Sequence, residues 1–130
     1  MLTGLIAFAQ FFGVAVVLTL VFQAVYMLVT PHKEVDLIKA NNPAAAVVYV
    51  GALGGFVIPL ASALANSVSL LDFVLWGLVA GVVQIAAFLA FRLFYPRISA
   101  HIEAGEIAVA LKLAGWTLAI GLLNGASMTY

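Results

Sequence analysis

The residues best suited to chemistry in this sequence are polar side chains inside long apolar runs. Runs of about 20 apolar residues are typical of membrane-spanning helices, where a polar group needs a partner. We predict a polar cluster toward one side of the membrane, where a proline frees a backbone carbonyl near Gly55. Its candidate members are Pro59, Ser62, Asn66, Gln84 and Asn124. They either form hydrogen bonds between helices or line a polar path for an ion or small solute.

Ionisable side chains lie mainly in two turns between the apolar runs. Residues 30–46 hold four of the ten charged residues, and residues 96–106 hold three more together with a histidine. We predict that both turns contact lipid headgroups or a peripheral protein. Plain solvation of His32 and snorkelling of Arg92 to the interface are the alternatives. The candidate contact residues are His32, Glu34, Lys39, Arg92 and Arg97.

Signatures of other function classes are missing from the sequence. It has no GxSxG, P-loop or GxGxxG motif, and no acidic residue lies deep in an apolar run. His32 and His101 lack metal-ligand spacing, and the chain has no cysteine. The net charge is zero, so nucleic-acid binding has no electrostatic basis. We predict no enzyme activity, no cofactor, no metal and no nucleic-acid partner.

Composition sets the class of fold. The chain is 66% hydrophobic and 8% charged, against about 25% charged in soluble domains. We predict an all-α integral membrane protein, with residues 1–130 forming a single membrane domain. Its four transmembrane helices are expected at about residues 4–29, 43–65, 72–95 and 107–128.

Local signals place the ends of the helices in the first turn. Thr30 and Pro31 are expected to begin a short helix at the membrane surface. Asn42 is a good N-cap and Pro43 a good first residue for the second span. Pro59 is expected to kink that span.

Charge asymmetry predicts the orientation. All five basic residues lie on or near the turns after the first and third spans, and the turn at residues 66–72 has none. The positive-inside rule therefore places both basic turns in the cytoplasm and both termini outside, N-out and C-out.

An internal repeat agrees with this topology. Aligning residues 38–40 with residues 102–104 pairs Ala44 with Ala108 and Gly51 with Gly115. We predict two tandem helical hairpins of the same orientation, at about residues 1–66 and 67–130. Three Gly-xxx-Gly patterns favour close helix packing, either within one chain or along a homo-oligomer seam. They begin at Gly51, Gly77 and Gly121.

Several short motifs occur in an order that resembles the YjfL family, small bacterial inner-membrane proteins grouped as a domain of unknown function. The resemblance covers essentially the whole chain, and Lys112 departs from the family pattern. The motifs are Thr30-Pro31-His32-x-Glu34, Leu37-Ile38-Lys39, Asn41-Asn42, Ala44-Ala45, Ile58-Pro59-Leu60, Ser62-Ala63, Asn66, Trp76-Gly77, Gln84, Arg92, Asn124 and Met128-Thr129.

The resemblance implies four spans in a bacterial inner membrane and brings no reaction, substrate or cofactor. It also implies an envelope-stress setting, with a peripheral cytoplasmic protein of phage-shock type as a partner. We therefore expect a non-enzymatic, homo-oligomeric membrane component that engages lipid or that partner through its cytoplasmic turns. The alternative is a small oligomeric channel or transporter built on the polar cluster.

Overall fold

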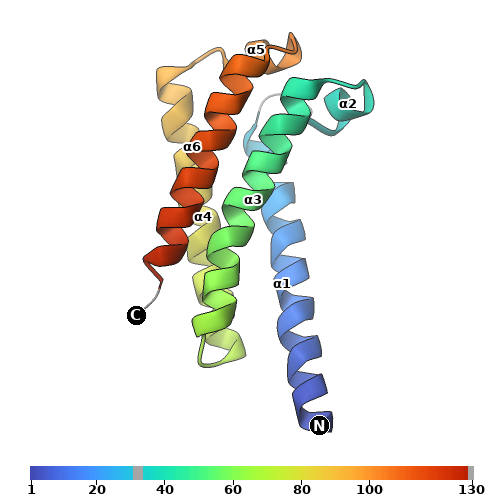
Figure 1. Cartoon of the computed structure of the whole chain (residues 1–130), viewed down its shortest axis with the longest axis vertical. Coiled ribbons are helices and arrows are strands. Elements are labelled where there is room, and N and C mark those ends of the chain that lie inside the picture. The colour runs from blue at the N-terminus through green and yellow to red at the C-terminus, as the bar shows by residue number, and fades with distance from the viewer. Residues whose placement is uncertain (31–33, 129–130) are drawn as a thin grey trace.

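The computed structural model describes residues 1–30 and 34–128, which form four long helices and two short ones (Figure 1). The long helices are apolar enough to cross a membrane, which confirms the predicted all-α fold with four spans. A short helix precedes the second long helix, and another precedes the fourth. In chain order the helices are α1 (Leu2–Val29), α2 (Glu34–Lys39), α3 (Pro43–Asn66), α4 (Leu70–Phe94), α5 (Ile98–Glu103) and α6 (Ile107–Ala126).

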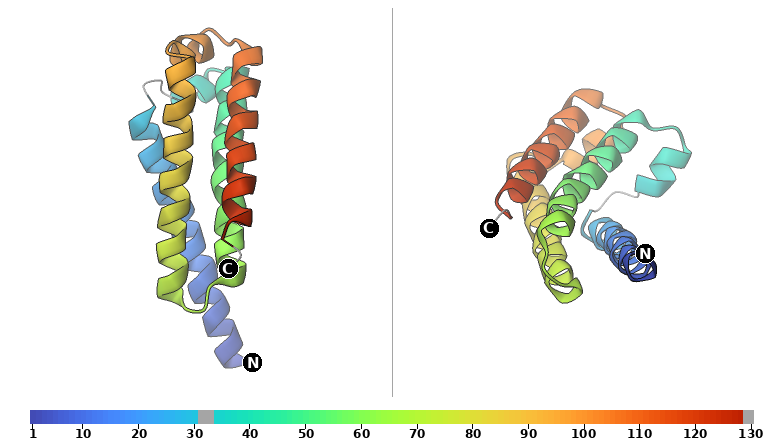
Figure 2. Two further views of the ribbon diagram at one scale, coloured as in Figure 1. Left: turned by 90° about the vertical axis from the view of Figure 1, so that its left-hand side faces the viewer. Right: turned by 60° about the horizontal axis from the view of Figure 1, so that its bottom comes forward.

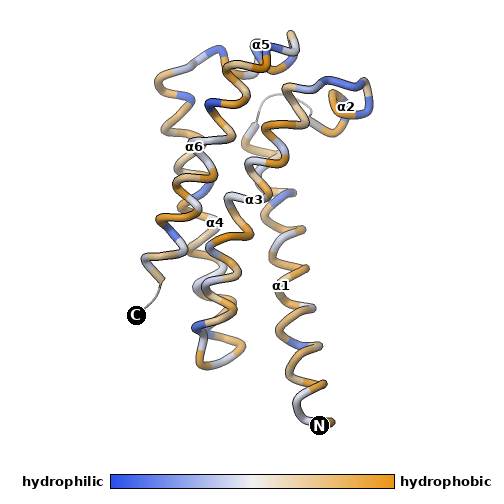
Figure 3. The backbone as a smooth tube through the Cα atoms, in the orientation of Figure 1, coloured by the Kyte–Doolittle hydropathy of each residue, from blue (hydrophilic) through white to orange (hydrophobic). Residues whose placement is uncertain are grey.

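The helices α2 and α5 lie at the same end of the molecule, which we call the turn end (Figure 1). The N-terminus lies at the opposite end, and α6 runs from the turn end toward that side. Colouring by hydropathy shows hydrophilic residues concentrated around α2 and α5, while the long helices are mostly apolar (Figure 3). Charged and apolar residues are thus separated along the long axis of the molecule.

Side-chain caps fix where α3 and α4 begin. The Asn42 side chain accepts a hydrogen bond from the Ala45 amide at 3.0 Å, and Pro43 is the first helical residue, as predicted. The Ser69 hydroxyl accepts from the Asp72 amide at 3.1 Å, and the Asp72 carboxylate accepts from the Val68 amide at 3.1 Å. This reciprocal capping starts α4 at Leu70, two residues before the predicted boundary.

The predicted cap at Thr30 would bond to amides among residues 31–33 and so lies outside the described residues. Thr30 ends α1: its amide donates to the Tyr26 carbonyl, and its hydroxyl donates to the Met27 carbonyl. Its backbone is extended, with φ −81° and ψ 129°, because a residue before proline avoids the helical region. The helix α2 begins at Glu34, and the predicted role of Pro31 lies outside the described residues.

In α2, Leu37 and Ile38 are half-buried against the core, and Asp36 and Lys39 are exposed. Val35 is 42% exposed. The short helix therefore turns Leu37 and Ile38 toward the protein core and its described charged residues outward.

The tightest packing in the fold joins α3 to α6 along what we call the α3–α6 seam. A Cβ atom added to Gly51 would lie 2.7 Å from Cα of Ala114. A Cβ atom on Gly121 would lie 2.8 Å from Cα of Gly55, and one on Gly125 would lie 3.2 Å from Cα of Pro59. Contacts between backbones this close need glycine. The Gly51 and Gly121 patterns therefore pack within one chain, and a homo-oligomer would need another surface.

Pro59 sits in the middle of this seam and does not interrupt its helix. The α3 helix continues through Pro59 to Asn66, and Pro59 is fully buried. Because proline has no amide hydrogen, the Gly55 carbonyl has no donor four residues along the helix. The backbone of Gly121 packs against that carbonyl instead, so close that a Cβ atom added to Gly121 would collide with the Gly55 oxygen.

The first helix is much less embedded than the others. Only 11% of the most apolar window of α1 is buried within the chain, against 50% for α3. Its N-terminal turns extend beyond the other helices (Figure 2). It contacts them mainly through aromatic rings: Phe22 stacks on Phe56 at 4.3 Å, and Tyr26 meets Phe88 edge-on at 5.4 Å. Lipid must therefore solvate most of the α1 surface.

Candidate functional site

The predicted polar cluster is partly assembled, and its centre is Gln84. The Gln84 side chain is 1% exposed, and its amide nitrogen donates to the Thr117 carbonyl at 3.1 Å. The Asn124 amide nitrogen lies 3.4 Å from both the Gln84 side-chain oxygen and the Ala80 carbonyl oxygen. Gln84 and Asn124 therefore join α4 to α6 in the membrane interior.

The Gln84 amide also lies against the seam. A Cβ atom on Gly55 would approach the Gln84 amide nitrogen to 2.9 Å and the Thr117 carbonyl oxygen to 2.8 Å. Glycine at this position therefore leaves room for the hydrogen bond between Gln84 and Thr117. Three helices, α3, α4 and α6, meet at this single point.

The other predicted members lie further along α3. The Ser62 hydroxyl donates to the Gly125 carbonyl at 2.7 Å and so joins α3 to α6. Asn66 is exposed and donates to the Ser62 carbonyl of its own helix at 2.8 Å. The structure therefore brings Pro59, Ser62, Gln84 and Asn124 to the packed helices and leaves Asn66 at the helix end. Their geometry is that of hydrogen bonding between helices.

Among the predicted contact residues, Lys39, Arg92 and Arg97 are exposed. Arg92 lies in the last turn of α4, and Arg97 directly precedes α5. His32 lies outside the described residues, as does the side chain of Glu34. Of the described contact residues, each therefore presents its charge to the surroundings at the turn end.

The two turns are tied together by a residue that was predicted only as a cap. The side-chain amide of Asn42 donates to the backbone carbonyls of Ile102 and Glu103 at the end of α5, at 2.8 and 3.3 Å. Ile98 and Ile102 of α5 are fully buried. The turn end is therefore a fixed surface built from both halves of the chain. No signal within a single turn predicts this link, because its partner is about 60 residues away.

Sequence reasoning also missed polar groups on α1 and α6. Gln23 is 7% exposed, and neither its amide nitrogen nor its side-chain oxygen has a hydrogen-bond partner. Thr117 is buried and bonds back to the Leu113 carbonyl at 2.9 Å. The Trp116 indole donates to the Ala87 carbonyl at 2.8 Å and adds a link between α6 and α4. Each stood in an apolar run without a neighbouring polar residue to mark it.

Chemistry other than packing has little basis in this geometry. Within residues 1–30 and 34–128, no group of three His, Cys, Asp or Glu side chains could hold a metal ion. Among the described residues, the titratable side chains of His101 and Glu106 contact each other at the end of α5. They lie at the turn end, outside the long helices.

The fold and site together define a multi-pass helical membrane protein whose polar interior residues join helices. The chain belongs to the DUF350 family, described as a domain of unknown function, whose model matches residues 1–128. It is 40% identical over 129 residues to the UPF0719 inner membrane protein YjfL of Escherichia coli (strain K12), covering 99% of this chain and 98% of that protein. The resemblance predicted from the motifs is thereby confirmed.

A second relative is more distant. The chain is 27% identical over 122 residues to the UPF0719 transmembrane protein YshE of Bacillus subtilis (strain 168), covering 91% of this chain and 88% of that protein. No solved structure matches the chain. Family membership and the four spanning helices make this an inner-membrane protein of a family without an assigned activity.

Proposed function

We propose that the protein is a non-enzymatic, oligomeric component of the inner membrane whose turn end engages a cytoplasmic partner or lipid headgroups. One observation carries the proposal: α2 and α5 form a single charged surface, tied together by Asn42. Exposed Lys39 and Arg97 lie on that surface, and Arg92 lies one turn below it. The expected partner is a peripheral protein of phage-shock type in an envelope-stress setting.

The proposed topology has both termini outside and the turn end in the cytoplasm. Four described basic residues support it, because Lys39, Arg92, Arg97 and Lys112 all lie at or next to the turn end. A single cysteine in place of Asp36 should react with a membrane-impermeant maleimide only in permeabilised cells. A cysteine in place of Val68 should react in intact cells. The natural chain has no cysteine, so there is no background labelling. The reverse pattern would overturn the topology.

We further propose that the chain consists of two related hairpins. The helices α2 and α5 each have six residues, and the turns that follow them contain matching hydrogen bonds. Each residue in the second turn lies 64 positions after its counterpart in the first. The backbone amide of Asn42 donates to the Leu37 carbonyl, and the backbone amide of Glu106 donates to the His101 carbonyl. The residues before them have positive φ, 65° at Asn41 and 75° at Gly105. This shared ending of a helix, with a left-handed residue, supports a duplicated unit.

Partner binding is tested by photo-crosslinking in native membranes. A photoreactive amino acid at Lys39 should capture a peripheral cytoplasmic protein, and one at Val68, in the opposite turn, should not. Replacing Glu34 and Lys39 with alanine should lower recruitment of that protein while the far-UV circular dichroism of the helices stays unchanged. No adduct at Lys39, or equal adducts at both positions, would overturn the proposal.

A further inference from the structure

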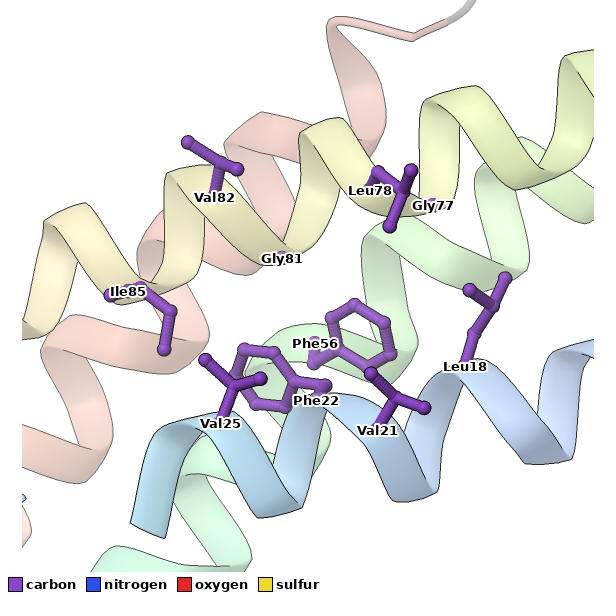
Figure 4. Close-up of a pocket in the computed structure, with 10 residues that line it drawn as sticks. All are labelled: Leu18, Val21, Phe22, Val25, Phe56, Gly77, Leu78, Gly81, Val82 and Ile85. Atoms are coloured by element: carbon purple, nitrogen blue, oxygen red, sulfur yellow. The ribbon is translucent and has the colours of Figure 1, made fainter. Parts of the chain in front are cut away.

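An apolar groove runs between α1 and α4 along residues 18–25 of α1, next to the buried residues of that helix (Figure 4). Its volume is about 290 Å³, and every residue that lines it is apolar. Phe22 and Phe56 form its floor, stacked on each other, while Val25 and Val82 lie on its two rims. We call it the α1–α4 groove.

Two aromatic contacts bound the groove along the helices. Phe11 meets Phe73 at 6.0 Å toward the N-terminus of α1, and Tyr26 meets Phe88 at 5.4 Å toward the turn end. Between these contacts α4 presents Gly81, where an added Cβ would have no neighbour closer than 3.6 Å. Leu18 of α1 packs on Gly77 of α4, and the space beyond this contact, toward Gly81 and Ile85, forms the apolar groove.

The size of the groove fits a hydrocarbon chain better than a helix. A cavity of about 150 Å³ admits one benzene molecule, so about 290 Å³ admits roughly a dozen carbon atoms. A helix with its side chains is about 10 Å across and would need a wider space. An acyl chain of a phospholipid has the required shape and polarity, and it is the solvent of this surface.

The positively charged side chain of Arg92 lies at the level expected for the headgroup of that lipid. Gly81, Ile85 and Arg92 are separated by four and seven residues, which places them on the same face of α4. Arg92 is therefore about 10 Å above Ile85 and about 22 Å above Gly77, at a rise of 1.5 Å per residue. One leaflet of the hydrocarbon core is about 15 Å deep. An acyl chain that fills the groove thus brings its phosphate to the level of Arg92.

We propose that the α1–α4 groove binds one acyl chain of an anionic phospholipid whose phosphate pairs with Arg92. This inference deepens the lipid contact of the proposed function and rests on it for Arg92. Arg92 is exposed, and Leu89 and Pro96 border the same hollow at the end of α4. Guanidinium groups bind phosphate oxygens in pairs, which suits a phosphodiester headgroup. In this site the groove binds the acyl chain of the lipid, and Arg92 favours lipids whose headgroup is negatively charged.

The test is retention of phosphatidylglycerol by the purified full-length protein, measured by native mass spectrometry. Arg92→Gln should lower the apparent affinity about tenfold, and Lys112→Gln, an exposed basic residue of α6 toward the same end of the molecule, should leave it unchanged. Gly81→Leu should also lower it, because a leucine side chain would occupy the groove. Gly115→Leu is the matched control, since nothing lies within 4 Å of a Cβ atom at Gly115.

The outcomes separate this inference from the proposed function. Equal affinity in Arg92→Gln and the natural protein, or equal losses in Arg92→Gln and Lys112→Gln, would overturn the site. A photoreactive residue at Val82 should form lipid adducts, and a dimer adduct would assign the groove to a second copy and overturn the site too. If Arg92→Gln and Gly81→Leu lose lipid retention while protein crosslinking from Lys39 is unchanged, the lipid site is supported separately from partner binding. Loss of crosslinking from Lys39 with intact lipid retention would contradict only the partner proposal.

Discussion

Along the α3–α6 seam, glycines bring two backbones into direct contact, and in the α1–α4 groove the same Gly-xxx-Gly spacing meets only side chains. A Cβ atom at Gly121 would strike the backbone of α3, whereas one at Gly81 would be 3.6 Å from the nearest ring atoms. The seam is also crosslinked by Ser62 and joined to α4 through Gln84. The groove is bounded by side-chain contacts, which are the aromatic rings and Leu18 against Gly77. A small-residue pattern therefore permits close packing, and the residues opposite it decide whether packing occurs.

The largest predicted effect is at the seam. Gly121→Ala should destabilise the protein by about 3 kcal/mol, since the added methyl group can only be accommodated by moving a backbone. Unfolding in mixed micelles with increasing dodecyl sulfate measures the loss. Gly115→Ala on the same helix, with open space around it, is the control and should change stability by less than about 0.5 kcal/mol. Equal stability of the two variants would contradict the seam.

A smaller loss is expected in the polar cluster. Gln84→Leu removes the hydrogen bonds to Thr117 and Asn124 while keeping most of the volume. Hydrogen bonds between membrane helices contribute about 0.6–1.7 kcal/mol, so the loss should fall in that range. The same micelle titration detects it. Liposome flux of ions should be absent in both natural protein and variant, and flux that depends on Gln84 would instead support the channel alternative.

At the turn end, Asn42→Ala should cost about 1 kcal/mol because it removes the N-cap of α3. It also removes the link to α5, so hydrogen exchange of the α5 amides should accelerate. Asn66→Ala is the control: Asn66 bonds only to its own helix and should leave α5 exchange unchanged. Equal effects on α5 in the two variants would show that the turns are not joined through Asn42.

The smallest effect should lie in the groove. Gly81→Ala adds a methyl group at van der Waals distance, 3.6 Å, from the Phe22 and Phe56 rings, and alanine favours helix by about 1 kcal/mol over glycine. We expect unchanged or slightly higher stability in the micelle titration. A loss comparable to that of Gly121→Ala would show that α1 packs on α4 as tightly as α3 packs on α6, and would remove the contrast between the two regions.

Much of the fold follows from local sequence signals, and its helix pairing does not. Apolar length placed all four spans to within two residues, and Asn42-Pro43 placed the start of α3 because a cap acts on its own helix. Thr30 also closes α1 through its own amide and hydroxyl, a role that the sequence reading left out. The reciprocal caps at Ser69 and Asp72 were present in the sequence and account for the earlier start of α4.

The sequence indicates which residues belong to the candidate site, but it does not indicate which residues they bond to. Gln84 and Asn124 stood out as polar residues in apolar runs, yet their contact spans 40 residues and depends on how α4 meets α6. Gln23 stood in an equally apolar run, and its burial without a partner depends on the same tertiary packing. Three Gly-xxx-Gly patterns looked equivalent in sequence, and only the opposing helix separates the seam from the groove.

The most direct test of the α3–α6 seam is a disulfide between its two helices in native membranes. The pair Gly54→Cys and Leu118→Cys replaces two facing residues of the seam, since a Cβ atom on Gly54 would lie 2.9 Å from the end of the Leu118 side chain, and the chain has no other cysteine. Mild oxidation should give an intramolecular disulfide at the mass of one chain, and the pair Gly54→Cys and Gly115→Cys should stay reduced. A disulfide-linked dimer, or equal oxidation of both pairs, would contradict a seam that closes within one chain.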